Sequence, residues 1–368
     1  MTRRWIGLKL DPLDTLFFRD GRPFDATNRV SGGLPNPQTL AGAIRTAMLV
    51  DQGYTAEQFR KFAAERRKNQ DARTALGDRA ILNGFRGPWL AWHYSDGRVE
   101  PLLKVPQNLV REGEPGEGKW DRSRPQSNVP GWTDPQRLPL WRKDALDAKT
   151  PEGFLTLAGI VAYLQGGVPS DSQWYRPDDL YDFDNRTGIV IDPQTFTTKK
   201  SEIYGIRLLS LNPKALPHGG TKARLGLYAE ISANPNAPSW TARAIPFGGE
   251  GKYVRADTVG AVAWPTVPSS GRCVRCLATP AFVGDGLDHP DGLTDLNIRA
   301  AASDHPLPIS GWDIARNGPN RLRFAVPAGS VYFTESAENL PHDSVCTNSE
   351  DVAQGWGFAL TGVWPDEN

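Results

Sequence analysis

The sequence has few cysteines, no long apolar run and no excess of charge of either sign, and each absence excludes a class of protein. Three cysteines (Cys273, Cys276 and Cys346) are too few for a full disulfide framework, which predicts a reducing, cytoplasmic setting. No run of about 18 uncharged apolar residues occurs, so we expect no membrane span. The apolar stretch that follows Met1 is short and soon charged, so we expect no signal peptide.

Charge is balanced over the whole chain but unevenly distributed along it. Lysine plus arginine and aspartate plus glutamate number 42 each, which gives no overall attraction to nucleic acid. Residues 186–224 carry seven basic and two acidic side chains, whereas residues 324–368 carry seven acidic side chains and no lysine or arginine. The first stretch either faces phosphates or forms solvated loops. We expect the acidic stretch to face protein partners more than phosphates.

Histidine and cysteine form no pattern typical of catalysis or metal binding. The five histidines have no spacing typical of a nuclease or a catalytic triad, and His93 lies in an aromatic run that indicates packing. Cys273 and Cys276 form a lone C-x-x-C motif, whose sulfurs a strand would place on opposite faces. His342 and Cys346 could complete a zinc set, but nothing in the sequence places them nearby. We predict no metal and no cofactor.

The first part of the chain combines strands with few helices. At 368 residues, with 37 glycines, 31 prolines and 39% hydrophobic residues, the chain is long enough for two turn-rich domains. Apolar spacing and flanking residues predict strands at 5–10, 188–192, 203–211 and 225–232 and helices from about 37, at 55–78 and within 153–166. Residues 84–150 have little periodicity and suggest a loop insertion, most irregular at 112–136.

After Gly251 the pattern begins again, with strands expected at 274–283, within 321–334 and at 357–364. Few strands are separated by a long helix. Two α+β sandwiches with a boundary near residue 260 therefore fit the sequence better than one parallel sheet. We expect Trp312, Trp356 and Trp364 to fill the core or the interface of the second domain.

Two glycine-rich turns, at 248–252 and 355–358, occur where strand-like runs begin or end. Glycine allows the backbone to approach an anion closely and exposes its N–H groups. The first turn, Gly248-Gly249-Glu250-Gly251-Lys252, has neither the spacing nor the following Ser or Thr of a P-loop. The residues of this turn leave three interpretations open: a plain tight turn, a phosphate contact and, least favoured, nucleotide hydrolysis.

Basic residues accompany two further segments. Arg19 and Arg22 flank the turn Asp20-Gly21; they either belong to a surface hairpin with an internal ion pair or clamp phosphates. The expected helix start at Gln38 and Thr39 would offer free N–H groups to the same phosphates, and Arg45 could extend this track.

The expected hairpin of residues 186–200 protrudes with a basic tip formed by Arg186, Lys199 and Lys200. Phe196 near this tip could stack on a base, or it could plug against its own sheet.

Eight segments together resemble a known family, the RAMP-type subunit of the Cmr (type III-B CRISPR) effector complex that caps the 5′ end of the guide RNA. They occur in family order and cover both ends of the chain. The matching segments are LFFRDGRPF (16–24), PNPQTLAGAIR (35–45), DNRTGIVID (184–192), EIYGIRLL (202–209), IPFGGEGKYV (245–254), GWDIA (311–315), VPAGSVYF (326–333) and GWGFALTGVW (355–364).

The resemblance implies an α+β fold of two ferredoxin-like (RRM-like) domains, at 1–260 and 261–368. The first would carry the loop insertion (about 84–150) and a thumb β-hairpin (about 184–205). It implies a subunit that is not an enzyme, holds the crRNA 5′ tag, docks on the large polymerase-like subunit and meets the adjacent RAMP backbone subunit. Lys252 stands where the family suggests arginine, so the charge is kept without the bidentate fork.

The RNA contacts implied in this way share either a cation or a backbone able to approach a phosphate. The expected RNA-binding residues are Arg19, Arg22, Gln38, Thr39, Arg45, Arg186, Phe196, Lys199, Lys200, Gly248, Gly249, Gly251, Lys252 and Arg255. Two other functions compete with this one. A RAMP-fold endoribonuclease that processes guide precursors would need a general base, most plausibly a histidine, and a pure protein scaffold would contact no RNA.

Overall fold

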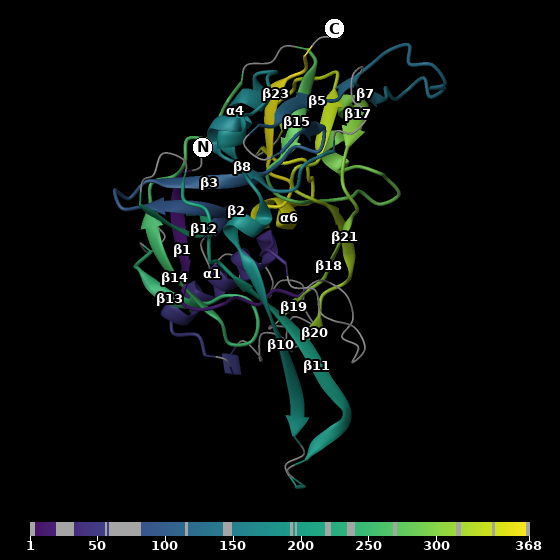
Figure 1. Ribbon diagram of the computed structural model, residues 1–368. Helices are drawn as coiled ribbons and strands as arrows, with labels where there is room; N and C mark the ends of the chain where they lie inside the picture. Colours follow the sequence, from purple (N-terminus) through teal and green to yellow (C-terminus); the bar gives the residue numbers. More distant parts are fainter. Residues whose placement is uncertain are drawn as a thin grey trace.

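The computed structural model shows an elongated molecule built mainly from antiparallel sheets (Figure 1). It describes residues 4–19, 33–55, 57–58, 82–114, 117–142, 149–191, 194–195, 197–217, 222–233, 240–267, 271–313, 318–340 and 343–365. The helix expected at 55–78 falls almost entirely outside these ranges. In the part of the chain described, no helix is both long and apolar enough to cross a membrane.

An eight-stranded antiparallel sheet forms the larger unit, with the strand order β13-β14-β1-β12-β2-β3-β8-β9. Its strands are β1 (Trp5–Pro12), β2 (Leu82–Tyr94), β3 (Val99–Lys104), β8 (Phe154–Leu155), β9 (Trp174–Tyr175), β12 (Ala223–Ala233), β13 (Arg243–Pro246) and β14 (Tyr253–Val259). The predicted strands at 5–10 and 225–232 are confirmed as β1 and β12. Four central strands, β14-β1-β12-β2, follow the order 4-1-3-2 when numbered along the chain.

Helix α1 (Pro37–Asp51) connects β1 to β2 and covers one face of this sheet. Its predicted start is confirmed: Pro37 occupies the first turn and the Asn36 side chain caps the helix by accepting from the Thr39 amide. Leu40, Ile44 and Met48 lie on one stripe and pack against the sheet. The other face of the same sheet packs against the C-terminal part of the chain.

Strands β2 and β3 occupy residues that the sequence assigned to a loop insertion, so the insertion does not begin at 84. The prediction was wrong there because β2 is buried on both faces. Leu90 and Trp92 point into the core beneath α1, while Trp89 and Ala91 point into the second core. A strand buried on both faces has no polar–apolar alternation, which is the pattern that identifies a strand in a sequence.

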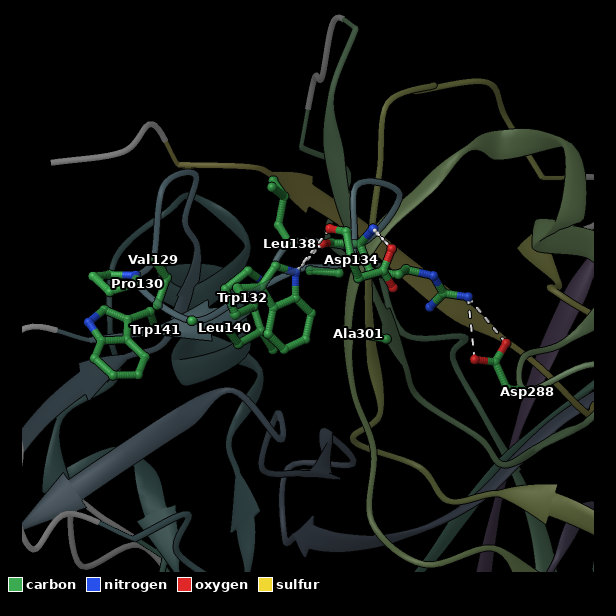
Figure 2. A pocket seen from close by; sticks show the side chains of 13 residues that line it. Val129, Pro130, Trp132, Asp134, Leu138, Leu140, Trp141, Asp288 and Ala301 are labelled. Carbon is green, nitrogen blue, oxygen red and sulfur yellow. Dashed lines mark hydrogen bonds and ion pairs between the residues drawn. The ribbon is translucent and has the colours of Figure 1, made fainter.

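The rest of the expected insertion is folded against the body in short pieces. They are β4 (Leu109–Glu112), β5 (Lys119–Arg122), β6 (Arg124–Pro125) and β7 (Leu140–Trp141), which pair as β4–β5 and β6–β7. Arg111 pairs with Asp171 at 2.7 Å and Arg122 donates to the Tyr163 carbonyl at 3.1 Å. The segment before β7 borders an open hollow (Figure 2).

The short helix expected within 153–166 is confirmed as α4 (Leu157–Leu164), which contacts β3 and the last strand, β23 (Ala359–Val363). A 3-10 turn η1 (Asp171–Gln173) and helix α5 (Pro177–Leu180) follow. The chain then leaves the body as the hairpin of β10 (Asp182–Ile191) and β11 (Thr198–Ser210), which projects at the end away from the C-terminus (Figure 1). The predicted protruding hairpin is therefore confirmed, and both its strands are longer than expected.

The C-terminal part contains a four-stranded antiparallel sheet, β17-β22-β15-β23. Read from β23 to β17 and numbered along the chain, its strands also follow the order 4-1-3-2. Its other strands are β15 (Cys273–Leu277), β17 (Ile298–Ala302) and β22 (Val331–Thr334). A second sheet has the order β16-β21-β18, from β16 (Ala281–Phe282), β18 (Leu307–Ile309) and β21 (Arg323–Val326). The C-terminal part also contains the strand pair β19 (Trp312–Asp313) and β20 (Gly318–Pro319), the 3-10 turn η2 (Asp291–Leu296) and helix α6 (Ser349–Gln354).

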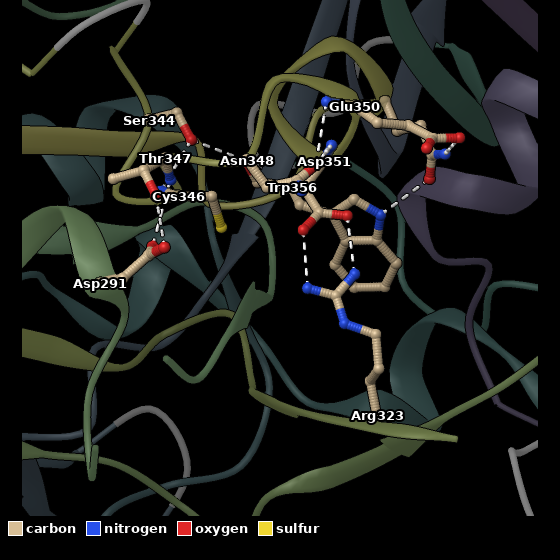
Figure 3. Close-up of polar contacts among 10 residues, drawn as sticks. Asp291, Arg323, Ser344, Cys346, Thr347, Asn348, Glu350, Asp351 and Trp356 are labelled. Carbon is tan, nitrogen blue, oxygen red and sulfur yellow. Dashed lines mark hydrogen bonds and ion pairs between the residues drawn. The ribbon is translucent and has the colours of Figure 1, made fainter. Parts of the chain in front are cut away.

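Arg323 of β21 ties the smaller sheet to α6 through two bonds to Asp351, at 2.8 and 2.7 Å (Figure 3). Asn348 caps α6, and the turn that follows it buries Trp356 against Phe282. The expectation that Trp356 and Trp364 fill the core or the interface of the C-terminal part is confirmed. Trp356 is buried in a core of that part, and Trp364 is buried in the core that it shares with the first part. The side chain of Trp312 lies outside the described part.

Candidate nucleic-acid interface

Residues 16–18 lie where three of the segments expected to contact RNA meet. Leu16 and Leu209, at the base of the hairpin, exchange backbone hydrogen bonds of 2.8 and 2.7 Å. The Phe17 carbonyl accepts from the Gly249 amide at 2.9 Å, and the Phe18 ring packs edge-on against Phe247 with centroids 5.6 Å apart. The base of the hairpin and the glycine turn therefore both contact residues 16–18, here called the phenylalanine segment, whose side chains are buried.

The glycine turn joins β13 to β14, and close packing explains its first glycine. Gly248 has φ of +84°, and a Cβ atom there would lie 2.4 Å from the Phe17 carbonyl oxygen, which no side chain could tolerate. Gly251 also has positive φ, but the space around it is open. The turn is thus exposed to solvent and seated on the phenylalanine segment, with the Gly249 amide already used in that seating.

Lys252 is held within this region by an acidic residue that the sequence did not single out. Its Nζ donates to Asp14 Oδ2 at 2.9 Å; the Lys252 side chain is 15% exposed and that of Asp14 is 66% exposed. The hydrogen bond from Lys252 lowers the pKa of Asp14, and the charges of Lys252 and Arg186 act in the same direction. Asp14 lies 238 positions from Lys252, so only the fold brings them together.

Two more of the expected cations are exposed and paired with neighbouring carboxylates. Arg186 on β10 binds Asp184 at 2.8 Å, and Arg255 on β14 binds Asp257 at 2.9 Å. Arg19 is exposed at the end of the phenylalanine segment, whereas Arg22 lies outside the described residues.

Lys199 and Lys200 belong to β11, on the projecting hairpin. Phe196 lies outside the described residues, as do the side-chain positions of both lysines. The prediction of a basic tip that contacts RNA therefore stays a prediction.

The start of α1 contacts the C-terminal part rather than open solvent. The Gln38 side chain donates to the Ser310 carbonyl, and the Thr39 amide donates to Asn36 at 3.2 Å. Arg45 is half-buried, with its guanidinium 5.2 Å from the centre of the Phe85 ring. These contacts leave the helix start near an interface between the two parts, and RNA contact by Gln38, Thr39 and Arg45 stays a prediction.

The histidine expected to be a packing residue is buried and bonded at both ring nitrogens. His93 Nδ1 lies 2.9 Å from Asp11 Oδ1, and Nε2 lies 3.1 Å from the Leu227 carbonyl oxygen. Burial raises the pKa of Asp11, but the hydrogen bond and charge of His93 together with the charges of Arg224 and Lys9 outweigh burial, so this pKa is lowered. His93 therefore has no free nitrogen to take a proton from a substrate.

The three cysteines are buried free thiols, and burial raises the pKa of Cys276 and of Cys346 to about 12. Within the described ranges, no group of three or more His, Cys, Asp or Glu side chains is arranged to hold a metal ion. Cys276 and Cys346 are thus packing residues with little thiolate character.

Comparison with known proteins gives a family and a fold. The model of a family described as CRISPR-associated protein (Cas_Cmr3) matches residues 8–364. No curated protein matches the chain. Two solved structures are similar: a cryo-EM structure of the Type III-B Cmr-beta bound to cognate target RNA, and one of the same complex with cognate target RNA and AMPPnP. The first shares 15% and the second 16% identity; each has a TM-score of 0.50 and covers 90% of this chain and 86% of the other.

Proposed function

Because the chain belongs to the Cas_Cmr3 family of CRISPR-associated proteins, we propose that it is a non-catalytic RNA-binding subunit of a type III-B effector complex. In this proposal it holds the 5′ tag of the crRNA and bridges the large polymerase-like subunit to the adjacent RAMP backbone subunit, in the cytoplasm. Sequence specificity comes from pairing by the guide. The subunit's own contribution is to position the tag through backbone amides, arginine and lysine.

The convergence at residues 16–18 is the observation that supports this proposal most directly. One region collects an exposed glycine turn, the exposed cations Arg19 and Arg186, the shielded cation Lys252 and the base of a projecting hairpin. A single-stranded RNA bound along it could meet a phosphate contact at each of these points. Neutralising several phosphates is the main source of affinity in such complexes.

We propose that both parts have ferredoxin-like cores. The strand order 4-1-3-2 in β14-β1-β12-β2 and again in β23-β15-β22-β17 supports this reading, because a split βαβ arrangement interleaves its strands in this way. In the first part α1 lies between the first and second of these strands, and in the second part α6 lies between the third and fourth.

Absence of catalysis is part of the proposal, and the placement of His93 supports it. General acid–base cleavage of RNA needs a group within hydrogen-bond reach of the 2′-hydroxyl. His93 is buried and committed to Asp11 and the Leu227 carbonyl. Incubation of the purified subunit with repeat RNA should give no cleavage product; a product lost on replacing any one histidine would establish an endoribonuclease instead.

The central test is retention of crRNA by the assembled complex when Arg19 and Lys252 are both replaced by alanine. We expect weaker retention and a salt dependence that is shallower by about 0.7 in log–log slope for each lost phosphate contact. Arg98→Ala is the matched control, because Arg98 is also exposed and paired with an aspartate, at the β2–β3 turn. Equal retention and slope in wild type and double variant would contradict the proposal. Retention of crRNA by the wild-type complex that does not change with salt concentration would favour a protein scaffold.

A further inference from the structure

An open hollow of about 690 Å³ lies between the segment 129–141 and strand β17 (Figure 2). Strands β7 and β17 mark its place, at the end of the molecule opposite the projecting hairpin (Figure 1). It is therefore separate from the region around residues 16–18. The Leu138 amide donates to the Arg299 carbonyl of β17 and fixes the segment against the C-terminal part.

Two exposed tryptophans give the hollow its apolar half. Trp132 is 48% and Trp141 51% exposed, which is unusual for the side chain that gains most from burial. Trp132 Nε1 donates to the Arg137 carbonyl at 2.7 Å and to the Asp134 carbonyl at 3.1 Å, so its ring is held in place. These rings present flat faces of the kind on which nucleotide bases stack.

The polar half continues from Arg137 into an adjoining hollow of about 400 Å³. Arg137, His289 and Arg299 line this second hollow, with amide and hydroxyl side chains around them. Among the described residues, His289 Nε2 and Arg299 Nε have no hydrogen-bond partner. Arg137 belongs to the lining of both hollows, so the two hollows meet at its side chain.

Two carboxylates lie beside these cations, and a phosphate could take their place. Asp288, which is 73% exposed, lies 3.2 and 3.4 Å from the Arg137 guanidinium and 2.7 Å from His289 Nδ1. Glu335 lies 3.5 Å from Arg299 Nε. Exposed pairs at such distances contribute little, whereas a phosphate forms stronger, charge-assisted bonds with guanidinium groups.

We propose that the two hollows together bind a nucleoside monophosphate, with the base against Trp141 and Trp132 and the phosphate at Arg137 and Arg299. The ligand is either a free nucleotide or one unpaired nucleotide of an RNA strand, since both present the same base and phosphate. A proline-rich or aromatic peptide would use the tryptophan half alone and leave the guanidinium and imidazole groups without a role.

Titration of the full chain with 5′-AMP tests the proposal. We expect saturable binding that weakens about tenfold, the scale of one lost base–aromatic stack, in Trp141→Ala, and similarly in Arg137→Ala. Adenosine and inorganic phosphate, each carrying half of the ligand, should bind more weakly than 5′-AMP. Asp288→Asn should tighten binding, because it removes the anion that competes for Arg137.

Two control variants test whether binding is specific to this site, and an oligoadenylate distinguishes a free nucleotide from a nucleotide of RNA. Arg98→Ala, at a distant exposed pair, and Phe324→Ala, at an exposed aromatic residue of β21, should leave binding unchanged. Tighter binding of a short single-stranded oligoadenylate than of 5′-AMP, with the same sensitivity to Trp141→Ala, indicates an RNA nucleotide; 5′-AMP binding that the oligomer cannot displace indicates a free one. Absent binding of both, or binding that the Trp141 and Arg137 variants leave intact, overturns the proposal. Release of a protein subunit from the complex by Trp141→Ala with nucleotide binding unchanged overturns it in favour of protein docking.

Discussion

At the scale of single residues, three cations of the candidate interface are held in ion pairs with carboxylates at the protein surface. Lys252 pairs with Asp14, Arg186 with Asp184 and Arg255 with Asp257. Such pairs are worth little in water, so an RNA phosphate can replace the carboxylate at small cost.

Removal of the Asp14 charge should therefore strengthen RNA binding. Asp14→Asn leaves Lys252 without its anion, and we expect crRNA affinity to rise by up to about fivefold, since a pair with an exposed carboxylate contributes little in water. The measurement is crRNA binding by the assembled complex at low salt, where the gain is largest. Asp96→Asn, which frees Arg98 far from the site, is the control; a gain equal to that of the control would show that Lys252 does not contact RNA.

Gly248 should be the least replaceable residue of the glycine turn. Gly248→Ala places a methyl group 2.4 Å from the Phe17 carbonyl oxygen at a φ of +84°, and we expect a loss of about 1–3 kcal/mol of unfolding free energy. Gly251→Ala is matched to it, because φ there is also positive but the surrounding space is open. Urea unfolding of both variants measures the difference, and equal losses would mean that seating on Phe17 does not matter.

At the scale of elements, strongly patterned segments could be predicted from the sequence and doubly buried ones could not. Helix α1 has a cap, a proline and an apolar stripe, and β12 is flanked by turn residues, so both elements could be predicted from the sequence. Strand β2 was read as loop because Trp89 and Trp92 face two different cores. Contacts such as Lys252 with Asp14, or Gly249 with Phe17, depend on the sheet order, which no local pattern encodes.

The projecting hairpin should be removable without unfolding the body. Thr187 and Gly205 face each other across β10 and β11, so residues 188–204 can be replaced by Asn-Gly, a pair suited to a two-residue hairpin turn. Because Leu208, Leu209 and the Leu16 bridge remain, we expect the unfolding free energy to stay within about 0.5 kcal/mol of wild type.

RNA binding should respond differently from stability in this shortened chain. We expect reduced crRNA retention and a shallower salt slope, by about 0.7 for each phosphate contact removed. Filter binding of crRNA to the assembled complex over a range of salt concentrations gives both quantities. Full retention by a normally folded shortened chain would exclude the hairpin from the interface.

At the scale of the whole molecule, a buried polar network joins the two parts. Glu230 of β12 is fully buried and accepts from Tyr228 at 2.8 Å and Trp264 at 3.0 Å, and Arg86 lies 3.5 Å from it. The Arg86 guanidinium lies between the rings of Trp5 and Phe358, 4.2 and 4.5 Å from their centres. The Arg86–Glu230 ion pair thus contacts every part of this junction: strands β1, β2 and β12, the connecting segment at Trp264, and the C-terminal part.

Replacement of Arg86 should lower the unfolding free energy and loosen the contact between the two parts of the chain. Arg86→Met keeps an apolar stem between Trp5 and Phe358 but leaves the Glu230 carboxylate buried without its cation, which costs about 3–5 kcal/mol when one partner of a buried pair is removed. Because Trp264 is bonded to the same carboxylate, we also expect faster amide exchange across residues 261–267. Arg98→Met, at an exposed pair with Asp96, should change neither quantity. Urea unfolding and hydrogen exchange of the three proteins measure both effects. If Arg86→Met unfolds like wild type and residues 261–267 exchange at the same rate, the shared apolar core alone joins the two parts and the network has no organising role.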